Sequence, residues 1–265
     1  MVDKVEIDYE VPEIWKHEDD LGGKWGSINQ PTAGARYDHN LPSGNSPMQL
    51  YSLATPNGIK VSIMLEELIA LGCDDAKYDA HIINIGKGEQ FSSGFVGINP
   101  NSKIPALVDK TTSPETSIFE SGAILLYLAD KFKQFIPETN AGRTSCLSWL
   151  FWQVGSAPYL GGGFGHFYTY APIKIKYCID RFTMETKRQL DLLDKHLQNN
   201  RFICGDTYTI ADMSIFPWYG GVILNRVYSA AKFLNADSYV NLLRWANEIY
   251  QREAVQKGML VAKNK

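Results

Sequence analysis

Apolar and polar positions follow two different periods in the first half of the chain, and they predict an alternation of strands and helices. Residues 48–53 form an apolar run that reads as a buried strand. Residues 59–68 then carry apolar side chains with a period near 3.6, and Gly72 closes this run, which predicts a helix. Further strands are expected over residues 78–85, 104–107 and 117–119.

A second helix is expected to begin at Glu120–Ser121, because Leu125, Leu128 and Phe132 recur on one side of the sequence that follows. Ser121 is a candidate N-cap, and Glu120 suits the first turn. The pair is either a helix cap and nothing more, or a second helix end that binds a carboxylate. The resulting order, strand–helix–strand and then strand–strand–helix, is that of a thioredoxin-like βαββα unit.

Beyond residue 140 the pattern is helical throughout. An aromatic helix is expected over residues 143–158, interrupted by the glycines 161–163, and a long helix over about residues 173–197. Thr209 and Asp212 read as the N-capping box of a buried helix, and an Asp that caps a helix is a poor candidate for a general base. The chain therefore divides into an N-terminal extension, an α/β domain, a linker and an all-helical domain, with the boundaries 1–47, 48–132, 133–142 and 143–265.

Composition and charge exclude several classes of protein. The 265 residues are 45% hydrophobic and carry a formal charge of −3, as expected of an ordinary globular protein with an ample core. The chain has no basic block interleaved with aromatic residues, so we expect no nucleic-acid partner. Its beginning is acidic and polar, and no apolar run approaches ~18 residues. We therefore expect a cytoplasmic protein that does not enter a membrane.

The four cysteines, Cys73, Cys146, Cys178 and Cys204, lie far apart in the sequence. None forms a Cys-x-x-Cys pair or a metal-ligand spacing with one of the five histidines. We interpret them as buried or incidental thiols, and we expect no metal site.

The segment Thr55–Gly58 stands where the first predicted strand gives way to the first predicted helix. Free backbone N–H groups and the positive end of the helix dipole make such a place an anion site. Thioredoxin-like redox proteins carry Cys-x-x-Cys at this turn, whereas this chain has the hydroxyl of Thr55 and the amide of Asn57. These groups can donate hydrogen bonds to a sulfur atom but cannot supply one, so we expect the thiol to arrive with the ligand.

A proline, Pro105, stands at the head of the third predicted strand. In a trans bond it would be unremarkable. A cis bond would turn the backbone N–H and C=O of Ile104 outward, where they could pair with an extended peptide. The residues alone favour the trans isomer, because only about one X-Pro bond in twenty is cis.

Three segments together resemble the corresponding parts of cytosolic glutathione transferases, namely Thr55–Gly58, Asn99–Leu107 and Glu120–Ser121. The sequence is most similar to the bacterial Nu class of that superfamily, whose members are glutathione-dependent disulfide-bond oxidoreductases. The resemblance covers roughly residues 15 to 260. The stretches that carry it best are 49–53, 61–68, 90–95 and 161–167.

The resemblance implies a thioredoxin-like N-terminal domain on an all-helical C-terminal domain, with Pro105 in cis, assembled as a homodimer. It also implies that the N-terminal extension folds over the active site and brings Asn29 to the ligand. The alternative is a strap that only adds packing area. Trp15 and Trp25 favour an ordered extension, because two tryptophans are costly to leave in water.

The resemblance further implies how glutathione is held. Thr55 and Asn57 are the implied catalytic residues at the ligand's sulfur, where hydrogen bonds and the helix dipole lower the thiol pKa from ~8.5 toward neutrality. The peptide backbone of glutathione pairs with Ile104, while its γ-glutamyl carboxylate binds Ser121 and its ammonium group binds Glu120. The complete implied set is Asn29, Thr55, Pro56, Asn57, Gln90, Lys103, Ile104, Pro105, Glu120, Ser121 and Arg181.

The family's sites hold two glutathione molecules, or one glutathione disulfide, in each subunit. Gln90 would reach the glycyl end of the first molecule, and Arg181 resembles an arginine that binds the second set of carboxylates. Without the resemblance, Arg181 is an ordinary solvated charge on a helix. The chain departs from its relatives at Val154, where they carry a glutamine; Gln153 stands one residue away, which turns its side chain by about 100° around a helix.

Two classes of function are compatible with these features. The first is a glutathione-dependent disulfide oxidoreductase that uses the ligand's own thiolate, with weak transferase or peroxidase activity on electrophiles. The second is a non-catalytic glutathione-fold protein that acts as a regulator or binds a partner. A conjugating transferase fits less well, because the usual Tyr or Ser is not evident at the catalytic turn. The expected co-substrate is glutathione, and the sequence does not name the disulfide or electrophile.

Overall fold

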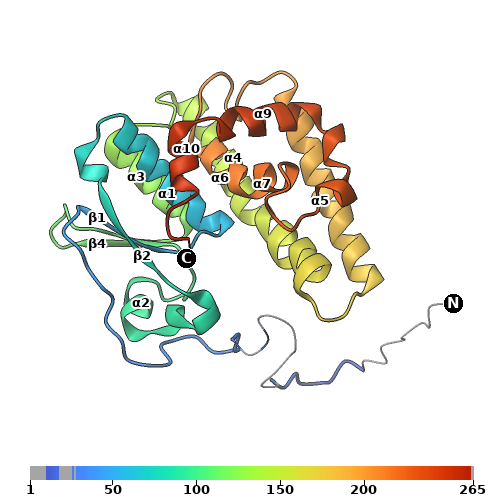
Figure 1. The fold of residues 1–265 in the computed structure, drawn as a ribbon, viewed down its shortest axis with the longest axis horizontal. Helices are drawn as coiled ribbons and strands as arrows, with labels where there is room; N and C mark the ends of the chain where they lie inside the picture. The colour runs from blue at the N-terminus through green and yellow to red at the C-terminus, as the bar shows by residue number, and fades with distance from the viewer. Residues whose placement is uncertain (1–9, 18–25, 27, 264–265) are drawn as a thin grey trace.

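The computed structural model describes residues 10–17, 26 and 28–263, which form an α/β domain and a helical domain (Figure 1). The first domain holds a four-stranded sheet in the order β2-β1-β3-β4. Strand β1 pairs in parallel with β2 and antiparallel with β3, which in turn pairs antiparallel with β4. The strands are β1 (Met48–Ser52), β2 (Tyr78–Ile82), β3 (Ala106–Asp109) and β4 (Thr116–Phe119).

Helices cover both faces of this sheet (Figure 1). Helices α1 (Pro56–Ala70) and α3 (Ser121–Phe132) pack together on one face, and α2 (Ser93–Ile98) lies on the other. The apolar side chains divide accordingly: Leu50 belongs to the core under α1 and α3, whereas Tyr51 joins Phe95 of α2. The order β1-α1-β2 followed by β3-β4-α3 confirms the predicted thioredoxin-like unit.

Helix α1 begins and ends as its sequence predicts. Thr55 is its N-cap and accepts a hydrogen bond from the backbone N–H of Gly58 at 3.4 Å, and Pro56 fills the first turn, where a missing N–H costs nothing. Gly72 has a φ of +82°, a left-handed conformation that glycine adopts without strain just after a helix end. The turn that the sequence marks as an anion site is therefore the start of a well-formed helix.

The helical domain begins with α4 (Asn140–Pro158), which starts three residues before the predicted position because Thr139 caps it. The helical run continues through the π-helical segment η4 (Tyr159–Tyr170), which packs on α5 (Lys176–Leu197). The remaining helical segments are η1 (Asp74–Ala76), η2 (Ile85–Lys87), η3 (Glu89–Phe91), α6 (Ile210–Ile215), η5 (Phe216–Gly220), α7 (Gly221–Ile223), α8 (Ala231–Leu234), η6 (Ala236–Ser238), α9 (Val240–Tyr250) and α10 (Glu253–Gly258).

The aromatic α-helix ends at Pro158, as predicted, but the glycines 161–163 do not break the helical run, which continues as the π-helical η4. Gly163 and Gly165 lie inside η4, where a Cβ atom would come within 2.2 Å of Phe182 and 2.1 Å of Tyr228 respectively. The glycines therefore serve a close approach between packed segments and do not end the helix.

Asp212 has the structural role that the sequence predicts. Its carboxylate accepts hydrogen bonds from the backbone N–H groups of Thr209 and Ile203 at 2.9 and 2.8 Å, and from the indole N–H of Trp245 at 2.9 Å. The capping box at the start of α6 is complete. A carboxylate occupied in this way is a poor candidate for a general base.

The end of the chain returns to α1 and supports the turn before it. Arg252 forms a bidentate ion pair with Glu67 of α1 at 2.5 and 2.7 Å. Gly258 packs so closely on α1 that a Cβ atom would lie 2.7 Å from the backbone of Ile63. The backbone N–H of Ala54 donates to the carbonyl of Ala262 at 3.0 Å. Within the described residues, no helix is long and apolar enough to span a membrane.

The N-terminal extension can be followed along the α/β domain from Ile28. The side chain of Arg36 donates to the carbonyl of Ile28 at 2.7 Å, and its guanidinium lies 3.4 Å from the ring centre of Phe91. Trp25 lies outside the described residues. Trp15 is 54% exposed, so it is not the buried anchor that the sequence led us to expect; the ring contact described for it is with its near neighbour, a histidine.

Candidate active site

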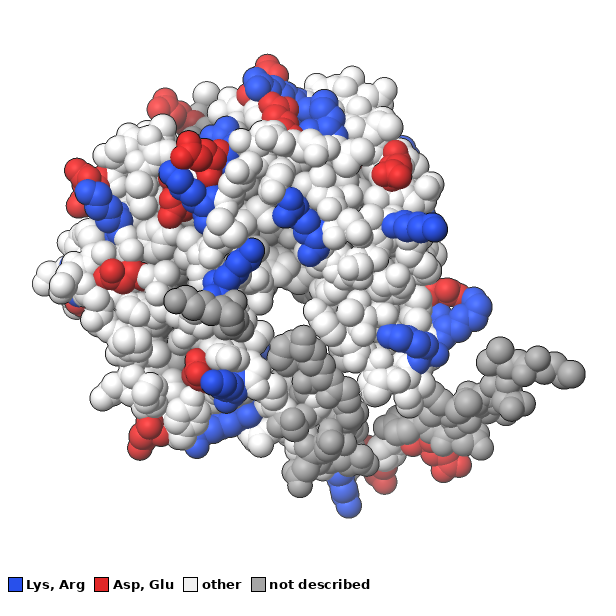
Figure 2. Space-filling model, viewed as in Figure 1, with Lys and Arg blue, Asp and Glu red and all other residues white. Residues whose placement is uncertain are grey.

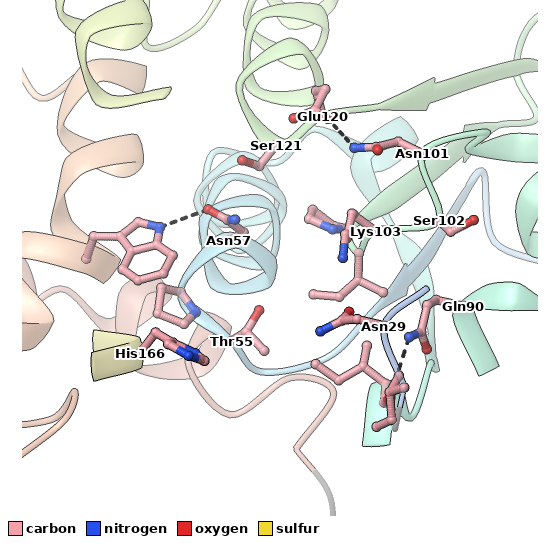
Figure 3. Close-up of a pocket in the computed structure, with 16 residues that line it drawn as sticks. Asn29, Thr55, Asn57, Gln90, Asn101, Ser102, Lys103, Glu120, Ser121 and His166 are labelled. Carbon is pink, nitrogen blue, oxygen red and sulfur yellow. Dashed lines mark hydrogen bonds between the residues drawn. The ribbon is translucent and has the colours of Figure 1, made fainter. Parts of the chain in front are cut away.

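A cavity of about 480 Å³ lies where the turn before α1, the loop before β3 and the start of α3 meet (Figure 3). In Figure 2 the surface of the molecule is hollowed between the two domains, and Lys or Arg side chains lie near the rim of this hollow. The cavity is lined by Ile28, Asn29, Thr55, Pro56, Asn57, Ile85, Gln90, Asn101, Ser102, Lys103, Ile104, Pro105, Glu120, Ser121, His166 and Trp218.

Thr55 and Asn57 present donors to this cavity. The Thr55 oxygen accepts the N–H of Gly58, so its own O–H group remains available to a ligand. The Oδ1 atom of Asn57 accepts a hydrogen bond from the indole N–H of Trp218 at 2.8 Å. This bond leaves the amide nitrogen on the cavity side of Asn57 (Figure 3). Two donors at a helix start suit a sulfur anion.

The start of α3 differs from the prediction in one respect. Glu120 is the N-cap, with a φ of +68° and no capping hydrogen bond from its side chain, and Ser121 is the first helical residue. The prediction that Ser121 is the N-cap is therefore wrong by one residue. The reason is that the Ser121 hydroxyl is engaged elsewhere: it lies 3.2 Å from Nζ of Lys60. The carboxylate of Glu120 accepts a hydrogen bond from Asn101 at 3.3 Å.

The loop before β3 supplies the third wall. The Ile104–Pro105 bond is cis, which confirms the prediction for Pro105. Ile104 and Lys103 both line the cavity beside it. On the opposite wall the buried Gln90 donates to the carbonyl of Ile85 at 3.4 Å, while its Oε1 atom has no hydrogen-bond partner among the described residues. That oxygen is an acceptor for a ligand donor.

Lys60 lies behind this site, 1% exposed, on α1. Its Nζ atom contacts Ser121 at 3.2 Å and Oε1 of Gln153 at 2.6 Å, and that same oxygen accepts the hydroxyl of Ser214 at 2.7 Å. Burial lowers the pKa of Lys60 to about 7, against the opposing attraction of the Glu120 carboxylate. Both protonation states of Lys60 are therefore populated near neutral pH, and its amine contacts the hydroxyl of Ser121 at the start of α3.

Of the predicted site residues, only Arg181 does not line the cavity. It is exposed on α5. Its charge acts on Glu185, whose pKa is held below its usual range mainly by Arg188 and in part by Arg181. Gln153 and Val154 do not line this cavity either: Gln153 is buried against Lys60, and Val154 packs on Gly122 of α3.

Six lining residues were not predicted. Asn101 and Ser102 belong to the turn that the sequence predicts before β3. The turn was predicted to lie at the site, but these two side chains were not singled out. His166 and Trp218 come from the helical domain, more than a hundred residues away from the turn, and only the packing of the domains reveals them. Ile28 and Ile85 are apolar wall residues without a sequence signal.

A second cavity of about 400 Å³ opens on the other side of the same turn. It shares Thr55 and Pro56 with the first cavity, and its far walls come mostly from the helical domain and the end of the chain. Its mixture of aromatic side chains and two basic ones suits a ligand with an apolar part and a negative charge. The far walls include Tyr170, Phe216, Tyr228, Arg226 and Lys263.

None of the four cysteines lines any of these cavities, and all four are free thiols. Among the residues that the structure describes, no three His, Cys, Asp or Glu side chains gather in a way that could hold a metal ion. The site therefore offers hydrogen-bond donors, a helix end and charges, but no sulfur of its own.

Comparison with known proteins places this arrangement in a family. The models of the glutathione S-transferase N-terminal and C-terminal domains match residues 46–130 and 176–248. The chain is 57% identical to the disulfide-bond oxidoreductase YghU of Escherichia coli over 253 residues, covering 96% of this chain and 88% of that protein. The chain belongs to the glutathione S-transferase family.

Two solved structures of glutathione transferases agree with this assignment. YghU of Streptococcus pneumoniae, complexed with glutathione, is 52% identical and has a TM-score of 0.94, covering 97% of this chain and all of that one. A glutathione transferase of Pseudomonas putida, with one glutathione disulfide bound per subunit, is 36% identical with a TM-score of 0.76, covering 83% and 93%. The two-domain glutathione transferase fold is thus confirmed.

Proposed function

We propose that this protein is a glutathione-dependent disulfide oxidoreductase that uses the thiolate of bound glutathione. One observation carries the proposal. A cavity between the cis-proline loop and two helix starts presents the Thr55 and Asn57 donors where a redox protein would carry cysteines. Similarity to the proteins named disulfide-bond oxidoreductases supports it. A non-catalytic binding protein is the alternative, and it would be free to lose these donors.

Each wall of the cavity has a role in this proposal. Thr55 and Asn57 donate hydrogen bonds to the glutathione sulfur, and the N-terminus of α1 adds its dipole, so that the thiol ionises more readily. Ile104 pairs with the peptide backbone, beside Lys103, Pro105 and Pro56. Ser121 binds the γ-glutamyl carboxylate and Glu120 the ammonium group. Asn29 and Gln90 complete the wall opposite α3.

The chemistry needs two glutathione molecules for each disulfide. The first thiolate attacks one sulfur of the substrate disulfide, forming a mixed disulfide and releasing one substrate thiolate. The thiolate of the second glutathione attacks the glutathione sulfur of that mixed disulfide. Glutathione disulfide forms, the second substrate thiolate leaves, and the two released thiolates take up the two protons that the glutathiones lost. Peroxides and other electrophiles would be weaker substrates of the same thiolate.

Reduction of 2-hydroxyethyl disulfide by glutathione tests the proposal. We expect the protein to accelerate this reaction, followed as formation of glutathione disulfide, well above the uncatalysed rate. A protein that binds glutathione but gives no acceleration with this disulfide or with a panel of small disulfides would be the non-catalytic alternative.

Arg181 is proposed to bind carboxylates of the second glutathione. In the structure it is exposed and close enough to Glu185 to affect the pKa of that carboxyl. Replacing Arg181→Ala should weaken binding of glutathione disulfide more than binding of reduced glutathione, because the disulfide carries twice the carboxylate charge and spans both subsites. Calorimetry with the two ligands measures this, and equal losses for both would remove Arg181 from the site.

We also propose that the protein is a cytoplasmic homodimer. The described cysteines are all free thiols, which suits a reducing compartment. Large apolar side chains are exposed on the helical domain, and a second copy of the chain would cover such a surface. They include Phe151 of α4 and Tyr177 and Met184 of α5, which are 65%, 77% and 62% exposed.

A further inference from the structure

A third cavity, of about 420 Å³, adjoins the proposed glutathione site and is lined by residues of both domains. It shares Asn57, Glu120 and Ser121 with the first cavity, and Lys60 and Gln153 also line it. Both of these side chains are at most 1% exposed to solvent. Burying an amine is costly unless the charged form has partners, so its position directly behind a ligand-binding hydroxyl calls for a physical account.

The hydrogen-bond partners of Lys60 and Gln153 do not use all the N–H donors of these two side chains. Its Nζ atom contacts Oε1 of Gln153 at 2.6 Å and the hydroxyl of Ser121 at 3.2 Å. A protonated amine has three N–H donors, and these two acceptors use only two of them. The Nε2 group of Gln153 has no hydrogen-bond partner among the described residues, although it is buried. A buried donor without a partner is uncommon, so the Nε2 group of Gln153 indicates that an acceptor is brought in from outside.

The proton on Lys60 also decides where the Ser121 hydroxyl points. A neutral Lys60 has a lone pair that can accept the Ser121 hydroxyl proton, which turns that hydroxyl away from the ligand. A protonated Lys60 has no lone pair and donates to the Ser121 oxygen, so the hydroxyl proton is free to be donated to a carboxylate. The two protonation states therefore present an acceptor oxygen or a donor hydroxyl at the start of α3.

We propose that Lys60 is a positioning residue for the γ-glutamyl carboxylate of glutathione: it takes up a proton when that carboxylate binds at the start of α3, and so directs the Ser121 hydroxyl toward it. This inference rests on the proposed function, because it assumes that glutathione is the ligand. No covalent change is involved, only the transfer of one proton from solvent to Nζ of Lys60.

The other charged groups around Lys60 are compatible with this coupling. Helix α3 contributes the carboxylate of Glu120, which attracts the ammonium form of Lys60. The side chains of α4 and α6 in this hydrogen-bond network are the neutral Gln153 and Ser214. Tyr228 lines the same cavity, and burial raises its pKa far above neutrality, so it keeps its proton. A second negative charge from the ligand would therefore act mainly on Lys60.

Calorimetry with S-methylglutathione tests the proposal, because this probe has no thiol proton to lose. Binding heats at pH 7.5 are compared among buffers with different heats of ionisation, which gives the number of protons taken up. A lysine with a pKa of about 7 is mostly neutral at this pH, so complete protonation would take up roughly 0.8 proton per site. Lys60→Met should abolish this uptake and weaken binding about ten- to hundredfold.

Two controls isolate the carboxylate and the lysine. The analogue of the probe without the γ-glutamyl α-carboxylate should bind the wild-type protein without proton uptake, and Lys60→Met should hardly change its affinity. Lys187→Met removes a half-buried lysine of α5 outside the described cavities and should leave the uptake unchanged.

The outcomes separate this inference from the proposed function. Tight binding of S-methylglutathione to the wild-type protein without proton uptake would overturn the role of Lys60 and leave glutathione as the ligand. No binding of the probe would overturn the proposed function together with the inference. If Lys60→Met does not fold, the wild-type comparison of the two probes still decides, because equal uptake with both would exclude coupling to that carboxylate.

Discussion

Asn57 depends on a residue from the other domain for its orientation. The indole N–H of Trp218 binds its Oδ1 atom at 2.8 Å, which fixes the amide nitrogen as the group that faces the ligand. Without that bond the amide could rotate and present its oxygen, which would repel a thiolate. The polarity of the catalytic turn is therefore set by a contact that joins the two domains.

Replacing Trp218→Phe tests this dependence. We expect kcat/KM for disulfide reduction to fall about three- to tenfold, the cost of one lost hydrogen bond of ordinary strength. Trp149→Phe is the matched control, because Trp149 packs on Trp152 and His196 outside the described cavities and its loss should leave kcat/KM unchanged. Equal effects in both variants, or none in Trp218→Phe, would mean that Trp218 only fills space.

The sequence revealed those site residues that can be recognised from their immediate neighbours in the chain. Thr55 and Asn57 stand out at a turn between a strand and a helix, whereas the cis isomer of Pro105 was implied only by the family resemblance. Trp218 and His166 could not be found in this way, because only the docking of the domains brings them to the turn. In the sequence Lys60 looks like an ordinary solvated charge, and only the tertiary structure shows that it is buried.

Local rules succeed for elements where they agree with packing, and fail where packing overrides them. Glycine is a poor helix former, so the glycines 161–163 predict a break. The chain instead continues as the π-helical η4, in which Gly163 and Gly165 allow a close approach to Phe182 and Tyr228. The capping box before α6 was predicted correctly, because its hydrogen bonds join residues only three positions apart.

The capping box should make a large contribution to stability. Asp212 is fully buried and satisfies donors of Thr209, Ile203 and Trp245. Asp212→Ala should therefore lower the free energy of unfolding by about 3 kcal/mol or more, since several buried donors lose their acceptor at once. Thr139→Ala, at the exposed cap of α4, should cost about 1 kcal/mol. Urea unfolding compares the two, and similar costs would contradict the account.

At the scale of the whole molecule, the order of strands and helices together with the family resemblance predicted the fold. Together they give a thioredoxin-like sheet followed by a helical domain, and both appear. The return of the last helix to α1 was not predictable, because the ion pair of Arg252 with Glu67 joins residues far apart in sequence. That return matters for function, since it supports the turn before α1 from behind.

The proposed homodimer gives a simple prediction at this scale. Light scattering at micromolar concentration should give twice the 29.8 kDa of one chain. Phe151, Tyr177 and Met184 are 65%, 77% and 62% exposed, and a second copy of the chain would remove such apolar side chains from water. A mass near that of one chain would show that these side chains are not covered by a second copy.

The central claim is that the reactive sulfur belongs to glutathione and that the turn before α1 only orients and ionises it. The most direct test compares two variants in glutathione-dependent disulfide reduction at pH 7 with saturating glutathione. A variant with Cys73, Cys146, Cys178 and Cys204 all changed to serine should keep most of its activity, with circular dichroism confirming that it folds.

The second variant, Thr55→Ala combined with Asn57→Ala, should lose about ten- to hundredfold in kcat/KM. That loss corresponds to roughly 1.4–2.7 kcal/mol, as expected for charge-assisted hydrogen bonds to a thiolate. A folded cysteine-free protein without activity, beside a fully active turn variant, would place the reactive sulfur in the protein and contradict the account.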